Sequence, residues 1–332
     1  MLENSLLIID GSALLSKHYY KTIPKELFKE KDLEKIEELQ QQIQHTSYGT
    51  YINGVNSMLN SILNILENDP PMYLIVCFDI TKETFRKKIY SEYKGTRKQI
   101  PTPLCEQFKL MIQILESIGI PVICSDKYEA DDYAGSISHK FENDVEVYIL
   151  TRDQDYYQLA TEKTTILMMQ TKDERLELLE KKFNKIHWYE NAFPFKTKEV
   201  KDWMGVYPYQ IPDFKGLAGD ISDNIPGVYG INTAAKPLLN VYTSIEELYT
   251  DIEKMKKNED YKKIQVKIWK QHGIKRSPYN MLIKENALES ALLSKKLATI
   301  IKTIPIKESL TDFILNINTN NLNMIKSILE LD

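Results

Sequence analysis

Cysteine and histidine are scarce in this chain, and their spacing argues against a soft-metal site. The three cysteines, Cys77, Cys105 and Cys124, are odd in number and form no C-x-x-C pair. We therefore expect neither a disulfide framework nor a thiolate zinc site. The five histidines include no pair four residues apart, so we interpret them as surface or packing residues.

Long apolar runs are also missing. No stretch approaches the length that a membrane span needs, and Met1 leads too quickly into the apolar run 6–9 for a signal peptide. We therefore expect a cytoplasmic protein in a reducing environment, without membrane attachment. The 332 residues, 42% of them hydrophobic, suffice for one large domain or for one domain with a satellite.

Positive charge is unevenly distributed, although the net charge of −4 argues against a general polyanion binder. The segment 82–98 carries seven lysines and arginines against two glutamates, with aromatic residues between them. Interleaved cations and aromatics are typical of a nucleic-acid track. A solvated basic loop is the alternative.

Short apolar runs alternate with helical patterns over the first 170 residues. The predicted strands are 6–9, 72–79, 120–124, 145–151 and 165–170, and amphipathic helices are predicted at 33–43, 49–66 and 103–118. This alternation predicts a largely parallel sheet in a three-layer α/β core. From about residue 200 the pattern changes to helices and short Gly/Pro turns, with helical stretches over 254–284 and 291–301.

Carboxylates follow several of the predicted strands. They are Asp10, Asp79, Glu129, Asp131, Asp132, Asp153 and Asp155, with Asp220 and Asp223 in a later loop. The carboxyl ends of parallel strands meet at one sheet edge, so the strand-end groups are expected to converge. For residues 129–132 alone, an acidic helix start stabilised by the helix dipole is the simpler alternative.

Nine neighbouring carboxylates cannot all stay ionised without compensation. Divalent cations supply it, and ligation by oxygen alone suits Mg²⁺ or Mn²⁺. Two such ions about 4 Å apart can activate water and stabilise the leaving oxygen in phosphodiester hydrolysis. The carboxylates therefore suggest a metal-dependent phosphodiesterase.

Several short motifs together resemble the 5′-nuclease or flap endonuclease family, which includes the exonuclease domain of bacterial DNA polymerase I and free-standing bacterial and phage relatives. The motifs are Ile9-Asp10-Gly11, Phe78-Asp79, Glu92-Tyr93-Lys94-Gly95-Thr96-Arg97, Glu129-Ala130-Asp131-Asp132, Thr151-Arg152-Asp153-Gln154-Asp155, and the stretches 219–228 and 291–300. The resemblance covers about residues 5 to 302 and implies two parts. Residues 1–199 would form a PIN-like 5′-nuclease core with a helical arch near 82–105. Residues 200–332 would form a helical region with a helix-hairpin-helix near 216–240.

The resemblance also implies roles for particular residues. Asp10, Asp79, Glu129 and Asp131 would dominate one metal site, and Asp132, Asp153, Asp155, Asp220 and Asp223 would serve a second. Lys94 and Arg97 would be catalytic, stabilising charge at the scissile phosphate. The substrate-binding residues would be Lys17, Tyr20, Arg86, Tyr93, Lys215, Gly227 and Gly230, with Tyr93 stacking on a base and Lys215 along the duplex. The hairpin would hold phosphates through backbone N–H groups, with K⁺ as a further candidate ion.

Three positions depart from the family pattern without touching a carboxylate. The hairpin reads Gly230-Ile231-Asn232, which predicts a weaker grip on the duplex, Lys17 replaces an arginine, and Gln154 replaces a lysine. The function expected is a Mg²⁺-dependent 5′-3′ exonuclease and structure-specific flap endonuclease of replication and repair. It would act as a monomer on DNA with a 5′ flap or 5′ end, or on an RNA–DNA hybrid.

Two alternative functions remain. The first is a PIN-type ribonuclease, against which the 219–228 motif argues. The second is a DNA-binding relative without catalysis, against which the nine carboxylates argue. From the length of the chain we expect no polymerase domain. The purpose of the helical insertion at 24–44 is open.

Overall fold

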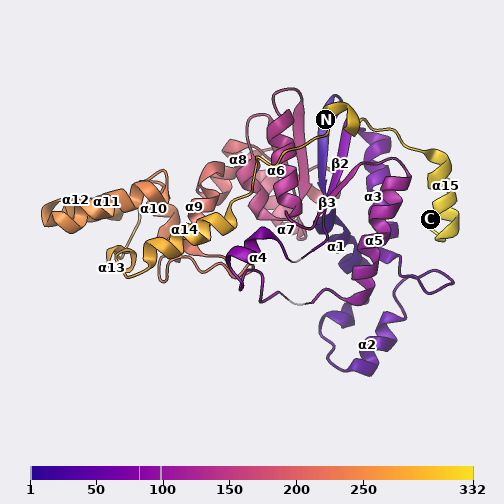
Figure 1. The fold of residues 1–332 in the computed structure, drawn as a ribbon, viewed down its shortest axis with the longest axis horizontal. Coiled ribbons are helices and arrows are strands. Elements are labelled where there is room, and N and C mark those ends of the chain that lie inside the picture. Colours follow the sequence, from indigo (N-terminus) through magenta and orange to yellow (C-terminus); the bar gives the residue numbers. More distant parts are fainter. Residues whose placement is uncertain (1, 82, 98, 332) are drawn as a thin grey trace.

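A six-stranded sheet forms the centre of the structure, a computed structural model that describes residues 2–81, 83–97 and 99–331 (Figure 1). The strand order is β3-β2-β1-β4-β5-β6. The strands are β1 (Ser5–Asp10), β2 (Tyr73–Asp79), β3 (Val122–Ser125), β4 (Glu146–Thr151), β5 (Thr164–Met169) and β6 (Ala192–Phe195). The first five are parallel, as predicted, and β6 is antiparallel to β5. The sequence reading missed β6, which is four residues long and contains a proline, a residue confined to sheet edges.

Side chains on each strand alternate between two apolar layers. In β1, Leu6 and Ile8 pack with residues of α6 (Ala130–Phe141), whereas Leu7 and Ile9 pack with residues of α1 (Gly11–Thr22) and α3 (Asn53–Asn68). Both faces of the sheet are therefore covered by helices. This confirms the predicted three-layer α/β core.

The other helices divide between the sheet region and the C-terminal half. Around the sheet lie α2 (Leu33–Gln40), α4 (Phe85–Ile89), α5 (Thr102–Ser117), α7 (Asp173–Phe183) and α8 (Thr197–Met204), with 3₁₀ helices at Lys25–Phe28, Gln154–Leu159 and Tyr189–Asn191. The C-terminal half contains α9 (Ile211–Ala218), α10 (Asn232–Leu239), α11 (Ile245–Lys257), α12 (Glu259–Gln271), α13 (Tyr279–Leu282), α14 (Ala287–Ala298) and α15 (Thr319–Ile328), with 3₁₀ helices at Pro208–Gln210 and Leu310–Phe313. Within the described residues, no helix has the length and apolar character of a membrane span.

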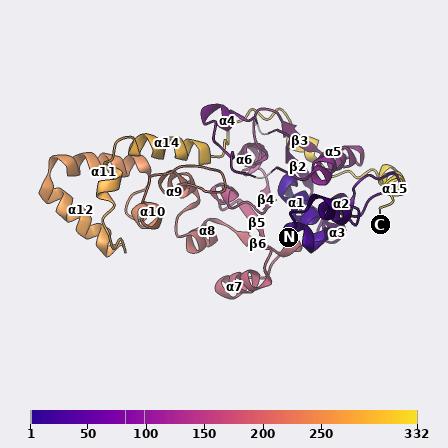
Figure 2. The same ribbon diagram turned by 90° about the horizontal axis from the view of Figure 1, so that it is seen from below.

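Helices α9 to α14 extend away from the sheet, with α11 and α12 at the far end, whereas α15 lies on the opposite side, near α5 (Figures 1 and 2). Helices α9 and α10 flank the hairpin predicted near residues 216–240. The predicted helical stretch 254–284 is broken into the end of α11, then α12 and α13. Asn258, the residue between α11 and α12, is extended and caps α12 through its side chain, which explains the first break.

The last segment of the chain returns to the sheet region instead of staying with the C-terminal helices. Ile301 N–H donates to Asp132 Oδ1 at 2.8 Å, and Leu315 N–H donates to the carbonyl of Met72 at 3.1 Å. Near the end, the carboxylate of Glu330 accepts a hydrogen bond from Ser47 N–H at 3.0 Å. The region predicted as 200–332 therefore includes a tail that packs on the core.

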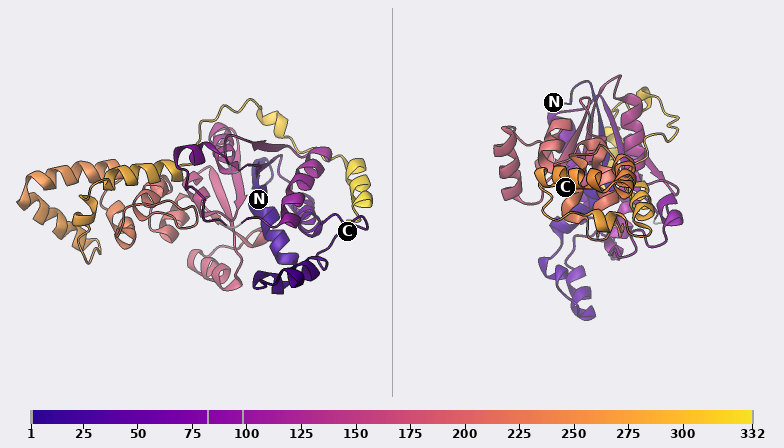
Figure 3. Two further views of the ribbon diagram at one scale, coloured as in Figure 1. Left: turned by 60° about the horizontal axis from the view of Figure 1, so that its bottom comes forward. Right: turned by 90° about the vertical axis from the view of Figure 1, so that its left-hand side faces the viewer.

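The predicted helical arch and the insertion at 24–44 each contain little regular structure. The segment expected to be a helical arch contains only the five-residue α4 and a series of turns before α5 begins, and Lys82 and Lys98 lie outside the described residues. The insertion at 24–44 forms a 3₁₀ turn and α2. It projects from the body of the molecule, at the bottom of the right-hand view in Figure 3.

Candidate functional site

The carboxyl ends of β1, β2 and β4 meet at one edge of the sheet. The chain leaves β1 toward β2 on one side and returns as β4 on the other, so this edge is a topological switch point, where open α/β sheets bind ligands. Asp10 ends β1 and caps α1, its Oδ1 accepting from Ala13 N–H at 2.9 Å. Its Oδ2 accepts from Thr151 Oγ1, at the end of β4, at 2.7 Å. Asp10 therefore joins two strand ends.

Asp79 connects the same edge to the start of α6. Its Oδ1 accepts from Ala130 N–H at 2.8 Å, and its own backbone N–H donates to Ser12 Oγ at 2.9 Å. The two strand-end aspartates are thus fixed by backbone groups of adjacent helix starts. Sequence reasoning placed both correctly at this edge, because a charged group can leave the core only where a buried strand ends.

Glu129 is the N-cap of α6 and lies at the meeting point of several segments. Its Oε1 accepts from Thr84 Oγ1 at 3.0 Å, and its Oε2 accepts from Tyr93 OH at 3.3 Å and pairs with Lys94 Nζ. Burial alone would raise the pKa of Glu129, but Lys94 and Arg86 outweigh it and lower that pKa. Glu129 is therefore held as a carboxylate by cations of the arch segment.

Asp132 differs from its neighbours, and its predicted role as a metal ligand does not fit its surroundings. It is 0% exposed, and its two oxygens each accept from Arg86 at 2.7 Å. The same oxygens accept from Ile301 N–H at 2.8 Å and from Glu129 N–H at 3.2 Å. Position N3 of the helix directs this side chain back toward the N-cap, in a capping box, and so into the core. Every oxygen of Asp132 already has protein partners.

Arg86 was predicted to contact substrate, but it is buried as well, with 1% exposure. Besides Asp132, it donates to the carbonyls of Leu297 and Thr299, each at 2.9 Å. Its guanidinium therefore ties α4 to α6 and to the end of α14, and does not reach solvent in this structure. The pattern of the sequence could not separate Arg86 from its exposed basic neighbours.

Asp131, next in sequence to Asp132, has the opposite environment. Its Oδ1 is buried and has no hydrogen-bond partner, and Arg86 Nη1 is 3.9 Å away. Burial raises the pKa of Asp131 well above its usual value, and the charges of Asp132 and Glu129 raise it further. A buried carboxylate oxygen without a partner is the position where a cation would be most stabilising.

The remaining carboxylates lie beyond β4 and in the loop after α9. Asp153 caps the 3₁₀ helix Gln154–Leu159, and its Oδ1 accepts from Asp155 N–H at 2.9 Å. Asp155 pairs with Lys215 Nζ, which also donates to Asp220 Oδ2 at 2.6 Å. Lys215 was predicted to lie along the duplex; the structure places its ammonium group among the carboxylates.

Asp223 completes the set and contacts the arch segment. Its oxygens accept from Tyr93 OH at 3.3 Å and from Arg97 Nη2, while its carbonyl accepts from Lys94 N–H at 2.8 Å. Asn224 Nδ2 also donates to the carbonyl of Glu92 at 2.8 Å. The arch segment is therefore fixed to the 219–225 loop, and Tyr93, 5% exposed, is not available to stack on a base in this conformation.

The electrostatic balance of the site is incomplete. Burial raises the pKa of Asp10 to about 7, helped by the charge of Asp79, and burial raises the pKa of Asp155 to about 7, helped by Asp153. Asp220 shows the reverse, because Lys215 and Ser222 outweigh burial and lower its pKa to about 2. At Asp10 no lysine offsets the burial, and at Asp155 burial and the charge of Asp153 outweigh the contact with Lys215.

Protein cations are already placed among these carboxylates. Within residues 2–81, 83–97 and 99–331, no three His, Cys, Asp or Glu side chains are arranged ready to hold a metal ion. The ammonium groups of Lys94 and Lys215 lie against Glu129 and between Asp155 and Asp220 instead. The structure therefore brings the predicted residues to one site, with protein cations compensating part of their charge.

The other predicted substrate residues differ in accessibility. Lys17 Nζ donates to both the carbonyl and the carboxylate of Glu190, each at 2.7 Å, and Tyr20 is partly exposed on α1. Gly227 N–H donates to Ser294 Oγ at 2.9 Å, so it is not free for a phosphate, whereas Gly230 is exposed in the hairpin with φ of 82°.

Sequence reasoning missed three polar residues that hold predicted site residues: Thr84 bonds Glu129, Thr151 bonds Asp10, and Glu190 bonds Lys17. Thr151 could have been found, because it ends the predicted strand directly before Arg152-Asp153. Glu190 had no such signal, since its contact with Lys17 joins positions 173 residues apart.

The sheet order, the carboxylate edge with its basic segment, and the helix-hairpin-helix region together define an α/β nuclease fold with a helical C-terminal domain. Two family models match the chain in agreement with this fold. The 5′-3′ exonuclease N-terminal resolvase-like domain matches residues 5–186, and the 5′-3′ exonuclease C-terminal SAM fold matches residues 206–321. The chain therefore belongs to the 5′-3′ exonuclease family, whose members are nucleases that hydrolyse phosphodiester bonds.

Individual relatives agree. A 5′-3′ exonuclease of Buchnera aphidicola is 32% identical over 321 residues, covering 94% of this chain and 92% of the relative. DNA polymerase I of Caldicellulosiruptor bescii is 35% identical over 270 residues, covering 80% of this chain. The match spans only 28% of that polymerase.

Solved structures share the fold at low sequence identity. The phage T5 D15 protein crystallised with metal ions has a TM-score of 0.55 at 16% identity, covering 98% of this chain and 94% of the other. The catalytic core of Rad2 in complex with DNA has a TM-score of 0.58 at 13% identity, covering 98% and 87%.

Proposed function

We propose that this chain is a divalent-metal-dependent 5′-3′ exonuclease and structure-specific flap endonuclease that hydrolyses phosphodiesters near the 5′ end of DNA. The observation that supports this proposal is the edge of the sheet where the strand-end carboxylates gather. The lysines and arginines there are too few to neutralise them. Relatives support the proposal: T5 5′-exonuclease binds divalent metal ions, T5 D15 flap endonuclease forms a complex with DNA and metal ions, and Rad2 binds a DNA substrate.

The residues present fit a divalent cation. The donor set is entirely carboxylate oxygen, which suits Mg²⁺ or Mn²⁺, and the buried Oδ1 of Asp131 lacks a partner. The ligands of one ion would be Asp10, Asp79, Glu129 and Asp131; those of a second would be Asp153, Asp155, Asp220 and Asp223. We leave out Asp132, because Arg86 and Ile301 occupy its oxygens. Bound ions would supply an activated water and stabilisation of the leaving oxygen.

The cations of the arch segment have a role that the metal does not replace. Lys94 and Arg97 are paired with Glu129 and Asp223, at the edge of the carboxylate group. With Glu129 and Asp223 engaged as metal ligands, Lys94 and Arg97 would be available to pair with a phosphate oxygen. Their charge would then stabilise the negative charge that develops on the phosphate. The buried pair of Asp132 and Arg86 would position the arch segment without touching substrate.

Substrate range and assembly are further parts of the proposal. We propose DNA with a 5′ flap or a free 5′ end as substrate and an RNA–DNA hybrid as a second substrate, in replication and repair. A monomeric state, a cytoplasmic location and K⁺ at the hairpin stay predictions.

The test uses a 5′-flap duplex labelled at its 5′ end, with either a DNA or an RNA flap. Pure protein with Mg²⁺ or Mn²⁺ is expected to release short 5′ products, and EDTA is expected to abolish release. A preparation that leaves both flaps uncut in either metal would contradict the proposal.

A further inference from the structure

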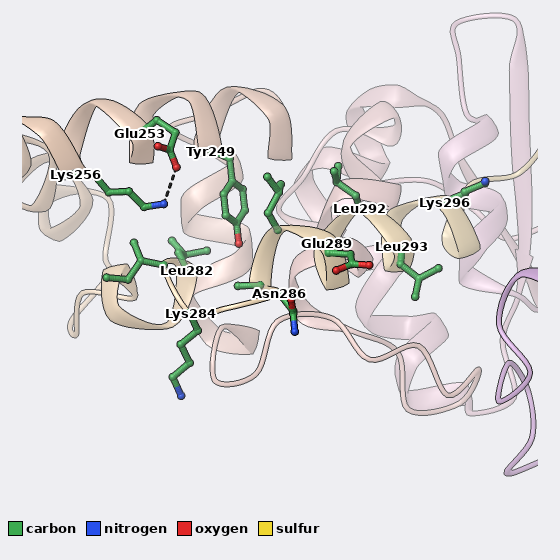
Figure 4. Close-up of a pocket in the computed structure, with 13 residues that line it drawn as sticks. Tyr249, Glu253, Lys256, Leu282, Lys284, Asn286, Glu289, Leu292, Leu293 and Lys296 are labelled. Carbon is green, nitrogen blue, oxygen red and sulfur yellow. Dashed lines mark hydrogen bonds and ion pairs between the residues drawn. The ribbon is translucent and has the colours of Figure 1, made fainter.

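A hollow of about 640 Å³ lies outside the carboxylate edge, between α11, α13 and α14 (Figure 4). Its floor is apolar and includes Leu282, Leu288 and Leu292. Lysines of three different segments line it: Lys256 of α11, Lys284 before α14, and Lys296 of α14. The size is in the range of small-ligand sites, and the mixture of apolar floor and cations suits a sugar-phosphate unit.

The N-terminus of α14 opens into this hollow without a cap. Asn286, the N-cap residue, has a left-handed backbone with φ of 62° and makes no side-chain hydrogen bond to the helix. Ala287 N–H is bonded to the carbonyl of Lys284 at 3.1 Å, but in the described structure the N–H groups of Leu288 and Glu289 have no acceptor. Unpaired N–H groups at the start of a helix attract anions, and phosphate above all.

A second observation also points to a ligand. Tyr249 of α11 lines the hollow and is 7% exposed, and its hydroxyl has no hydrogen-bond partner among the described residues. Figure 4 shows this hydroxyl directed toward the start of α14. A buried hydroxyl without a partner is costly unless something else supplies an acceptor. The tyrosine and the uncapped helix therefore present donors to the same space.

The surroundings connect this hollow with the hairpin. Lys284 Nζ lies 5.6 Å from the ring centre of Tyr229, which is exposed in the hairpin loop, and Met281 of α13 packs against Gly230. Glu253 is neutralised by Lys256 at 2.6 Å, so Glu289 is the one carboxylate among the described lining residues without an ion-pair partner. The balance of charge at the start of α14 therefore favours binding of an anion.

We infer that this hollow binds one backbone phosphate of the nucleic-acid substrate, held by Tyr249 OH and the N–H groups of Leu288 and Glu289, with Lys284, which points outward at the rim in Figure 4, adding positive charge at longer range. The inference rests on the proposed function and adds a contact outside the cleavage site. Helix α14 runs from the hollow to the buried Arg86, which bonds the carbonyl of Leu297. Twelve residues at 1.5 Å each place the two ends about 18 Å apart. At 3.4 Å per base pair, a duplex lying along α14 would cover this distance in about five base pairs.

The experiment measures dissociation constants of a 5′-flap duplex in EDTA, where binding is separated from cleavage. Tyr249→Phe is expected to weaken binding about tenfold, because a hydrogen bond to a charged group is lost. Lys284→Gln is expected to weaken binding and to reduce the slope of log affinity against log salt by about 1. Glu289→Gln is expected to strengthen binding. Lys263→Gln, an exposed α12 lysine paired with Asp260 outside the hollow, is the matched control and is expected to change neither.

Duplex length and protein stability give independent checks. The effects of Tyr249→Phe and Lys284→Gln are expected with about 12 base pairs of duplex and are expected to vanish with about 3. Tyr249→Phe removes an unpaired hydroxyl, so the fold is expected to be at least as stable to denaturant as wild type. A merely structural tyrosine would instead lower stability and leave the length dependence unchanged.

A binding measurement with inorganic phosphate distinguishes a nucleic-acid phosphate from free phosphate as the anion bound in the hollow. If wild type binds the flap duplex and Tyr249→Phe, Lys284→Gln and Glu289→Gln bind it equally well, the inference is overturned. The nucleic-acid assignment is also overturned if the variants change only the binding of inorganic phosphate, measured by ³¹P NMR. Failure of wild-type cleavage in Mg²⁺ is a different result, which contradicts the proposed function and leaves the binding comparison intact.

Discussion

Two adjacent aspartates are expected to respond in opposite ways to the same substitution. Asp132→Asn removes the charge that balances Arg86, a guanidinium with 1% exposure and two hydrogen bonds of 2.7 Å to that carboxylate. Breaking one side of a buried ion pair costs about 3 to 5 kcal/mol, because the remaining charge stays buried. Asp131→Asn instead removes a carboxylate with an unpartnered oxygen and two like charges nearby. Its stability in EDTA is expected to stay equal or rise.

The assay is denaturant unfolding of both variants and wild type in EDTA, followed by calorimetric titration with Mn²⁺. Asp132→Asn is expected to unfold at lower denaturant, and Asp131→Asn to keep its midpoint but lose Mn²⁺ affinity. The reasoning is refuted if Asp132→Asn unfolds like wild type and loses Mn²⁺ affinity, since Asp132 would then be a ligand instead of an anchor.

Three further substitutions test other contacts. Lys94→Ala should lower turnover about a hundredfold with a smaller change in flap affinity; unchanged turnover in single-turnover cleavage would remove Lys94 from the chemistry. Gly227→Ala should destabilise the fold by more than about 1 kcal/mol, because φ is 63° and the added Cβ would meet Gly219 N at 2.2 Å, and an unchanged unfolding midpoint would contradict this. The pKa of Glu190 is lowered, because His18, Lys17 and Ser61 outweigh burial, so Glu190 stabilises the fold above the pKa of an unfolded glutamate and this contribution is lost as pH falls. Glu190→Gln should therefore be less stable than wild type at pH 7 and converge with it in acid, and a pH-independent difference between their melting curves would refute that assignment.

The fold was predictable from the sequence because its strands are buried on both faces and end in charged residues. The runs at 6–9 and 72–79 are continuous apolar segments, which parallel sheets require, and each ends in an aspartate at the edge. The strand β6 was not predictable, since Ala192-Phe193-Pro194-Phe195 has neither the length nor the period of a strand. Its place depends on pairing with β5.

The candidate site was predictable as a set of residues but not as a set of contacts. Motif spacing correctly placed Glu129, Asp131 and Asp132 at one helix start. It could not predict that Asp131 and Asp132 have different surroundings. The environment of Asp132 is decided by Arg86, 46 residues away, and by Ile301, 169 residues away. Such long-range partners follow from the packed tertiary structure, and no local pattern records them.

The hairpin shows the same limit. The glycines at 227 and 230 were expected to present backbone N–H groups, and both have positive φ as a turn requires. Yet Gly227 packs against Gly219 and donates to Ser294, so its N–H serves the fold. The return of the last thirty or so residues to the sheet was likewise unpredictable, because these contacts join segments far apart in the chain.

The most direct measurement of the central claim compares wild type with Asp153→Asn on a 5′-labelled flap duplex in Mg²⁺, with binding and cleavage recorded separately. Asp153 is exposed at the edge and its Oδ1 accepts one backbone hydrogen bond, which an asparagine oxygen can also accept, so the fold should survive the change. The account predicts that wild type cuts near the flap junction, and that Asp153→Asn binds the flap but does not cut it. Equal loss of binding and cleavage, or cleavage that persists undiminished, would contradict the claim that this sheet edge is a metal-dependent nuclease site.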